Sequence, residues 1–264
     1  RYKNYDMLIS ISYPFYIHVV ASFFCGINKK IKLRIADCGD PFYSNPSSPK
    51  AFYLKYIERL VLRQFDYITI PEHVALPAYQ HCDIDDRIRV VHQGFRIVDV
   101  DKDAYRKNTP CTFCYAGVFY KKIRNPEFFF QWLTRIDCDF CFVVYALPDA
   151  YTVNLLMKYK DVLKEKLHIR DAVDREELIF SMAKMDFLIN FNNENSTQQP
   201  SKLIDYAMSR RPILSFNRQT FRPEVFEAFL AGDYREQYHV DLEQYDIRRV
   251  MDQFEVLFHE KTKE

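Results

Sequence analysis

Three polar side chains at the start of a predicted helix could bind a phosphorylated ligand, Ser201 and Lys202 at its phosphates and Asp205 beside them. They follow Pro200, which suits the first turn of a helix because its missing N–H would have no partner there. Free backbone N–H groups and the helix dipole attract anions to such a helix start. The carboxylate of Asp205, one turn later, could accept hydrogen bonds from ribose hydroxyls. These groups suit a nucleoside diphosphate, although the spacing fits an ordinary capped helix with solvated Lys202 and Asp205 equally well.

The elements around this helix are those of a parallel sheet. The apolar run Phe187–Phe191 predicts a buried strand, and a polar loop over residues 192–199 leads into the helix. Pro212 ends the helix before a second apolar strand at residues 213–216. The order strand, loop, helix, strand is typical of a parallel sheet.

A second basic loop follows the predicted strand at residues 112–116. Gly117 comes directly after that strand, where a glycine lets the backbone approach a ligand closely. Arg124 lies just before the next predicted helix, which begins at Pro126. Loops at the carboxyl ends of parallel strands gather at one edge of the sheet, so we expect Arg124 and Lys202 to converge on one diphosphate. A solvated basic loop is the alternative interpretation.

The remaining pattern predicts an α/β protein with two Rossmann-like domains that each contain a parallel sheet. A charged, polar segment at residues 99–110 is predicted to be the linker. We therefore expect an N-terminal domain at residues 1–108 and a C-terminal domain at residues 109–264, the latter ending in an amphipathic helix. The predicted strands lie at residues 5–12, 31–36, 67–70, 87–92, 112–116, 140–145, 167–171, 187–191 and 213–216.

Two segments resemble one known family. The run Pro200-Ser201-Lys202-Leu203-Ile204-Asp205-Tyr206 resembles the P-S-K-[LIV]-x-[DE]-Y signature of retaining glycosyltransferases with the GT-B fold. These are enzymes of bacterial capsule, exopolysaccharide and lipopolysaccharide assembly. The run Y-A-G-x-F-Y-K-K-I-R-N-P at residues 115–126 resembles the first loop of that family's C-terminal domain. The resemblance implies a GT-B fold with an acceptor-side N-terminal domain and a donor-binding C-terminal domain.

The resemblance also implies roles for individual residues. Lys202 and Arg124 would act in catalysis by stabilising charge on the leaving diphosphate. The implied donor-binding residues are Gly117, Ser201, Lys202, Asp205, Thr197 and Gln198. Asp205 matches the second acidic residue of the family's E-x7-E motif. The first acidic position, which contacts the donor sugar in the family, falls on Thr197, and Glu194 is a candidate replacement.

The N-terminal half carries two weaker similarities. S-x-S-x-P at residues 10–14 and D-x-x-D-P at residues 37–41 resemble the middle of the family's N-terminal domain. They imply acceptor-side roles for His18 and Asp40. His18 lies on the helix that follows Pro14 and is expected to face the cleft between the domains, whereas a histidine on the helix surface without a function is the alternative.

The implied reaction moves a sugar from a nucleoside-diphosphate sugar to a glycan or lipid-linked acceptor, with retention and without a further cofactor. Two rival classes stay open: an epimerase or phosphorylase on the same fold, and a non-catalytic nucleotide-sugar-binding protein. We expect no metal site. The D-x-D motifs at residues 83–85, 99–101 and 137–139 are near the chance number for a chain with this many acidic residues, and none lies at the expected ligand edge.

The composition excludes several functions. The chain has 264 residues, and its 37 basic and 36 acidic residues give a net charge of +1, which provides no overall field for nucleic acid. Seven cysteines without metal-ligand spacing indicate the reducing cytoplasm. Apolar runs are shorter than the ~20 residues that span a bilayer, which leaves peripheral contact with the inner membrane face. The chain begins at Arg1, so we expect a preceding segment and an incomplete N-terminal domain.

Overall fold

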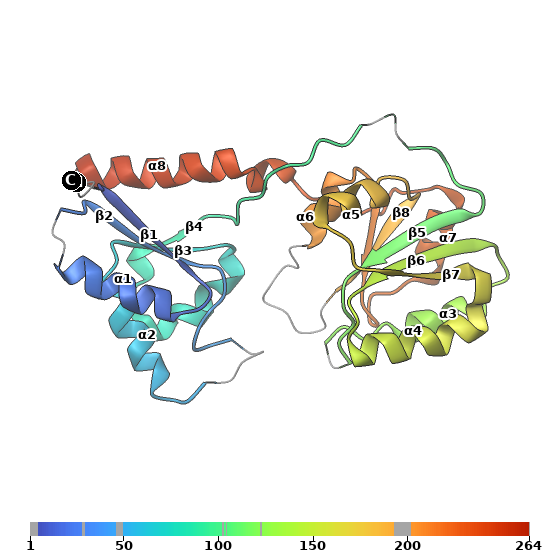
Figure 1. The fold of residues 1–264 in the computed structure, drawn as a ribbon, viewed down its shortest axis with the longest axis horizontal. Helices are drawn as coiled ribbons and strands as arrows, with labels where there is room; N and C mark the ends of the chain where they lie inside the picture. Colours follow the sequence, from blue (N-terminus) through green and yellow to red (C-terminus); the bar gives the residue numbers. More distant parts are fainter. Residues whose placement is uncertain are drawn as a thin grey trace. The chain divides into compact units, whose positions relative to one another are not determined.

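The computed structural model describes residues 5–27, 30–45, 50–101, 103, 105–121, 123–192 and 202–263. The chain forms two compact units, one made of Arg1–Arg96 with Glu243–Glu264 and the other of Ile97–Leu242. Each unit contains its own parallel sheet (Figure 1). The predicted fold class, α/β with two parallel sheets, is therefore confirmed. Within the described ranges, no helix is long and apolar enough to cross a membrane.

The first unit is a four-stranded sheet between helices. Its strands lie in the order β1 (Met7–Ser12), β2 (Leu33–Cys38), β3 (Tyr67–Ile70) and β4 (Ile88–Val90). Its helices are α1 (Tyr16–Ile27), α2 (Leu54–Leu62), the 3-10 helix η1 (His73–Cys82) and α8 (Ile247–Lys263). Side chains alternate between the faces of each strand, so Ala36 and Cys38 of β2 pack towards α1 and α2, while Leu33 and Ile35 face the other way.

Helix α8 covers that other face, which corrects the prediction that the terminal helix belongs to the C-terminal domain. Val250, Phe254 and Leu257 pack against Leu33, Ile35 and Tyr67 in one buried cluster. An amphipathic pattern shows that one face of a helix is buried, but it does not identify the partner. The strands that α8 packs against are separated from it in sequence by the whole second unit.

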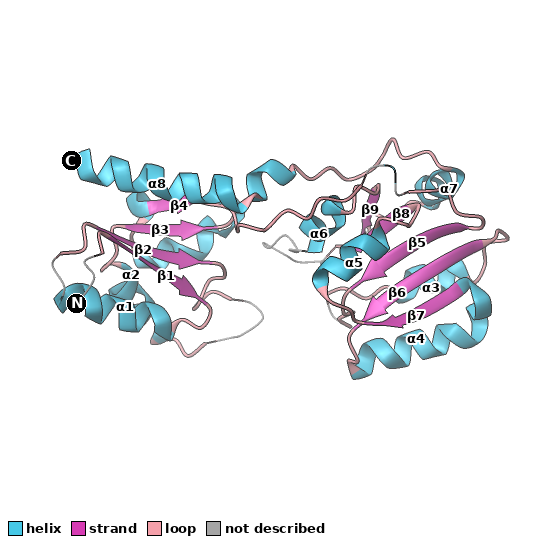
Figure 2. Cartoon of the chain, turned by 45° about the horizontal axis from the view of Figure 1, so that its top comes forward, coloured by secondary structure: helices cyan, strands magenta, loops and turns pink. Residues whose placement is uncertain are grey.

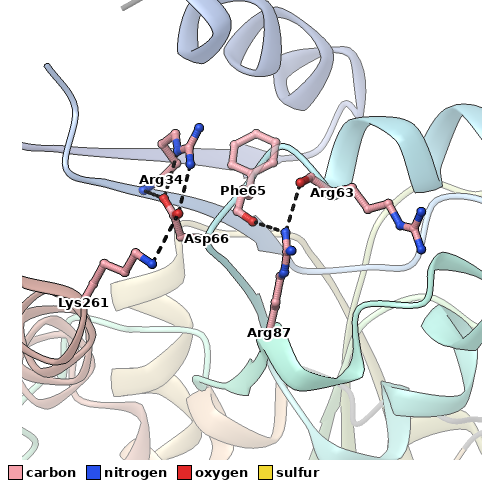
Figure 3. A network of polar contacts seen from close by, with 6 residues as sticks. All are labelled: Arg34, Arg63, Phe65, Asp66, Arg87 and Lys261. Carbon is pink, nitrogen blue, oxygen red and sulfur yellow. Dashed lines mark hydrogen bonds and ion pairs between the residues drawn. The ribbon is translucent and has the colours of Figure 1, made fainter. Parts of the chain in front are cut away.

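Polar contacts also attach α8 to the first sheet. Asp66 accepts hydrogen bonds from Arg34 Nε at 2.9 Å and Nη2 at 3.0 Å, and it lies 4.0 Å from the ammonium of Lys261 (Figure 3). Burial opposes ionisation of Asp66, but these cations keep its pKa below the usual value. In the same view, the guanidinium of Arg87 donates to the backbone oxygens of Arg63 and Phe65, which follow α2.

The start of α8 is held by the backbone after β4. The Phe95 N–H donates to the oxygen of Tyr245, and the Ile247 N–H donates to the oxygen of Phe95. Gly94 favours this close approach, since an added Cβ would lie 3.2 Å from Ile247 Cα and would meet the Ile247 side chain.

The second unit has the strand order β7-β6-β5-β8-β9. The bounds of these strands are β5 (Cys111–Ala116), β6 (Phe140–Ala146), β7 (Leu167–Asp171), β8 (Phe187–Phe191) and β9 (Ile213–Phe216). Its helices are α3 (Glu127–Leu133), α4 (Ala150–Leu163), α5 (Arg175–Met182), α6 (Lys202–Met208) and α7 (Pro223–Ala231). A phenylalanine-rich core joins α3, α4 and α7 to one face of the sheet, and α5 and α6 lie on the other (Figure 2).

The predicted linker is part of the second unit, so the boundary lies at residues 96 and 97 rather than at 108 and 109. Asp186, just before β8, holds this segment. Its carboxylate accepts hydrogen bonds from the Tyr105 hydroxyl at 2.5 Å, the Asn108 N–H at 3.1 Å and the Thr112 N–H at 2.7 Å. Polar groups of this segment therefore bind the buried carboxylate of Asp186, so the segment is not a free linker between the units.

We expect Phe254→Ala to destabilise the first unit by about 3 kcal/mol, because removing a buried phenyl ring leaves a cavity. The measurement is native-state hydrogen exchange: protection should fall at β2 and β3 and stay unchanged at β5 and β6. The control is Met251→Ala on the same helix, where the side chain is 45% exposed. Loss of protection in β5 and β6 instead would place α8 with the second unit.

Candidate functional site

The strand order of the second sheet reverses between β5 and β8, and ligands in open α/β sheets bind at the carboxyl ends of strands at such a point. β5 pairs with β6 as far as Ala116 opposite Tyr145. It pairs with β8 only at Phe113 and Cys114. The two central strands therefore separate before β5 ends.

Tyr206 of α6 fills the position that β8 leaves beside β5. Its hydroxyl accepts the N–H of Ala116 at 2.7 Å and donates to the oxygen of Ala116 at 3.2 Å. Both backbone groups are buried and would otherwise be unsatisfied at high cost. Tyr206 thus attaches α6 to the end of β5, which brings Lys202 of α6 to the loop that follows β5.

Gly117 begins the loop after β5. Its φ of +135° is a backbone conformation that other residues rarely adopt, and an added Cβ would lie 3.2 Å from the Tyr115 hydroxyl. That hydroxyl donates to the oxygen of Val118 at 3.0 Å. Gly117 itself donates its N–H to the oxygen of Tyr145 in β6 at 2.9 Å. The first residues of the loop are therefore fixed to the sheet.

Lys202 lies in an enclosed aromatic site. Its Nζ is 4.2 Å from the ring centroid of Tyr115 and 5.7 Å from that of Tyr206. Within the described part of the chain, this buried Nζ has no hydrogen-bond partner. Burial lowers the pKa of Lys202 well below its ordinary value of 10.5, and the charge of Arg124 lowers it further. An anion bound here would supply the missing partner and favour the protonated amine.

Arg124 lies close to the same tyrosine. Its backbone pairs with Tyr120 through two hydrogen bonds of 2.9 and 3.2 Å, which fix the end of the basic loop. Burial raises the pKa of the Tyr115 hydroxyl to about 12, and Arg124 opposes that shift. The structure thus brings Arg124 and Lys202 to one aromatic residue although 78 positions separate them in sequence. Two cations at one sheet edge can neutralise two adjacent phosphates.

Asp205 has a partner that the sequence analysis missed. Arg175, the first residue of α5, approaches Oδ1 of Asp205 at 2.7 Å with both Nε and Nη2. Arg175 also contacts the sulfur of Met208 at 3.4 Å. The available signal was that residue 175 begins the helix that comes next after β7, so it starts a third loop-to-helix step at the same edge of the sheet. This contact fixes the orientation of the Asp205 carboxylate.

Three predicted donor-binding residues lie outside the described residues. They are Thr197, Gln198 and Ser201, together with Glu194 and Pro200 of the same segment. Of the predicted donor-side residues, the structure therefore places Gly117, Arg124, Lys202 and Asp205.

The first unit has a pocket of about 350 Å³ at the carboxyl ends of β1 and β2. Asp40 lines it, as do the apolar side chains of Phe15, Val19, Phe42 and Ile57. This is the position in a parallel sheet where a ligand is expected.

His18 does not face a cleft, which corrects its predicted acceptor-side role. The side chain is 0% exposed. Its Nδ1 lies 2.7 Å from the Ser10 hydroxyl and its Nε2 3.5 Å from the Cys38 sulfur. Burial lowers the pKa of His18 to about 4, so the imidazole is neutral near pH 7. His18 connects α1 to β1 and β2 within the core.

Comparison with known proteins rests on structure. No family model matches the chain, and no curated protein matches its sequence. HepE of Anabaena, crystallised with UDP, is similar with a TM-score of 0.69 and 10% identity, over 97% of this chain and 79% of HepE. A glycosyltransferase of Rickettsia africae gives a TM-score of 0.67 and 11% identity, over 98% of this chain and 78% of its own. The chain has the GT-B fold.

TarM is also similar in structure, with a TM-score of 0.61 and 10% identity over 96% of this chain and 54% of TarM. A second crystal structure of HepE contains UDP-glucose. At these identities the similarity establishes the fold alone. The features of the site do not depend on that similarity. The strand reversal, the tyrosine pair and the two basic residues were all described from this chain alone.

We expect Lys202→Met to raise the free energy of unfolding by about 1 kcal/mol or more at pH 7, because methionine fills the site without a desolvated charge. The folded-state pKa of Lys202 is lower than the unfolded value, so wild-type stability rises with pH. The advantage of the variant should therefore shrink as pH approaches 10.5. Urea unfolding from pH 7 to pH 10 measures it, and a destabilised variant at pH 7 would contradict it.

His18 should make the first unit sensitive to acid. Its pKa is about 4 when folded and 6.5 as a free side chain, so the folded state binds fewer protons between these values. The stabilisation is present above pH 6.5 and is lost as pH falls towards 4, by roughly 3 kcal/mol in total. Urea unfolding should show this loss in the wild type and not in His18→Gln. Parallel pH profiles for the two proteins would disprove it.

Proposed function

We propose that this chain is a retaining glycosyltransferase that moves a sugar from a nucleoside-diphosphate sugar to a glycan or lipid-linked acceptor in polysaccharide biosynthesis. The observation that carries the proposal is the buried Lys202 amino group, which has no hydrogen-bond partner among the described residues and lies beside Arg124 at the strand reversal. The GT-B neighbours crystallised with UDP or UDP-glucose support a nucleotide-sugar as the donor.

The chain's own groups supply the chemistry that the transfer demands. Negative charge develops on the diphosphate as the sugar leaves. Lys202 and Arg124 would hold the diphosphate and stabilise that charge, and the backbone at Gly117 would lie against it. Asp205, oriented by Arg175, would accept hydrogen bonds from the ribose hydroxyls. Because two cations perform the neutralisation, the proposed reaction has no metal ion and no further cofactor.

The proposed acceptor site is the pocket of the first unit, where Asp40 lies among apolar side chains. A carboxylate suits a sugar hydroxyl, and the apolar wall suits a lipid or the face of a sugar ring. Exposed aromatic residues on and before α1 and α2, among them Phe23, Phe52 and Tyr56, support peripheral contact with the inner membrane face. That contact and a cytoplasmic location are parts of the proposal.

One observation favours a second candidate, a non-catalytic nucleotide-sugar-binding protein. Thr197 stands where the resembled family has an acidic residue that contacts the donor sugar. Such a protein would keep the diphosphate site and lose the transfer. An assay that measures donor hydrolysis and transfer beside donor binding separates the two, since only the enzyme consumes the donor.

Lys202→Met should weaken binding of UDP by about tenfold or more, because a charged hydrogen bond to phosphate contributes roughly 1.5–3 kcal/mol. Asp205→Asn should also weaken UDP binding, through the ribose, and leave binding of inorganic diphosphate nearly unchanged. Calorimetric titration of both variants and the wild type with UDP and with diphosphate measures these effects. The same titrations in EDTA should give unchanged affinities.

The matched control is Lys158→Met, which removes an exposed lysine of α4 that pairs with Glu127. Its affinities should equal those of the wild type. Equal UDP affinity in wild type and Lys202→Met would remove the main support for the proposed donor site.

A further inference from the structure

A carboxylate, an imidazole and a thiol meet in the first unit, on residues to which the proposed function gives no role, although Glu58 also lines the proposed acceptor pocket. Glu58 belongs to α2, and His81 and Cys82 end η1. The Glu58 Oε2 lies 2.8 Å from His81 Nε2, which lies 3.4 Å from Cys82 Sγ. One donor atom from each residue lies within 4.8 Å of the other two. This convergence joins α2 to η1 through Glu58 and His81, which are 23 positions apart in sequence.

The separations suit a small cation. Zinc binds nitrogen and oxygen at about 2.0–2.2 Å and thiolate sulfur at about 2.3 Å in tetrahedral geometry, so its ligand atoms lie roughly 3.3–3.8 Å apart. The imidazole–thiol distance already has this value. The carboxylate and imidazole must separate by roughly half an ångström, which a rotation of the partly exposed His81 allows. The set of sulfur, nitrogen and oxygen donors suits zinc, whereas magnesium and calcium prefer oxygen.

The carboxylate is held in place by the backbone. The Phe42 N–H donates to Glu58 Oε1 at 3.2 Å, and the Tyr43 N–H donates to Oε2 at 3.3 Å. The Tyr43 ring also meets the His81 ring edge-on, with centroids 5.3 Å apart. Groups that orient a ligand in this way are typical of the shell around a protein-bound metal. Glu58 is 1% exposed, Cys82 is 0% exposed, and His81, at 20%, leads to the surface.

We propose that Glu58, His81 and Cys82 bind one zinc ion, with water as the fourth ligand, and that the ion fastens η1 to α2. Binding replaces the S–H bond of Cys82 with an S–Zn bond and releases that proton to solvent. Without an ion, burial raises the pKa of Cys82 to about 12, although Arg59 and Arg63 oppose the shift. The site lies wholly within the first unit, so it is independent of the donor site proposed in the second.

The competing explanation is a hydrogen bond between Glu58 and His81 that needs no ion. Titration with Co²⁺ separates the two, because cobalt replaces zinc and absorbs through charge transfer from a thiolate ligand. We expect near-ultraviolet absorption that saturates at one Co²⁺ per chain and disappears when Zn²⁺ is added. The absorption should be lost in Cys82→Ser. In Glu58→Gln, the affinity for Co²⁺ should be at least tenfold weaker. The absorption should be unchanged in Cys141→Ser, which removes a half-buried thiol of the second unit.

A second measurement covers the case in which Cys82→Ser fails to fold. His81→Asn changes a partly exposed side chain, and its folding is checked by circular dichroism. Zn²⁺ should raise the melting temperature of the wild type and not that of His81→Asn. The absence of thiolate absorption in the wild type, or its persistence in Cys82→Ser, would overturn the site. An equal Zn²⁺-dependent shift in wild type and His81→Asn would also overturn it.

Discussion

The parting of β5 and β8 is the constraint on which the second unit depends. Their pairing ends at Cys114, two residues before β5 ends, so the backbone of Ala116 needs another partner, and Tyr206 supplies it. The same tyrosine fixes α6 and, with it, Lys202. The Tyr206 hydroxyl thus places a basic residue at the strand reversal, because the buried backbone groups of Ala116 need a hydrogen-bond partner.

Lys202 shows how such a site is kept at a cost in stability. An ammonium between two aromatic rings gains from cation–π attraction, but burial works against its charge. The rings are themselves held by hydrogen bonds to backbone, so the side chain cannot relax towards water without disturbing β5. Stability and ligand affinity therefore pull Lys202 in opposite directions, which is common where a protein prepares charge for a ligand.

Local pattern was sufficient to predict most of the sheet strands and the convergence of Arg124 with Lys202, since strand and helix periods and the parallel topology are local or general properties. It was not sufficient to assign α8 to a unit, because an apolar stripe does not identify the surface that it packs against. It also did not predict the burial of His18, because a polar residue on a buried helix face has the same spacing as one in solvent. Arg175 was missed for a related reason: an ion pair between two helix starts depends on their packing. The predictions for Thr197, Gln198 and Ser201 stay predictions.

Helix α8 gives the first unit a discontinuous sequence, because Ile97–Leu242 lies between its two parts. A ribosome therefore finishes the whole second unit before it makes the helix that covers Leu33, Ile35 and Tyr67. Until α8 is made, the first sheet lacks the cover of its second apolar face, whereas the second unit, which is continuous in sequence, has its whole core as soon as Leu242 has been added. The core of the first unit is therefore the later of the two to be completed, and we expect chaperone binding to the nascent chain to concentrate on the half that was synthesised first.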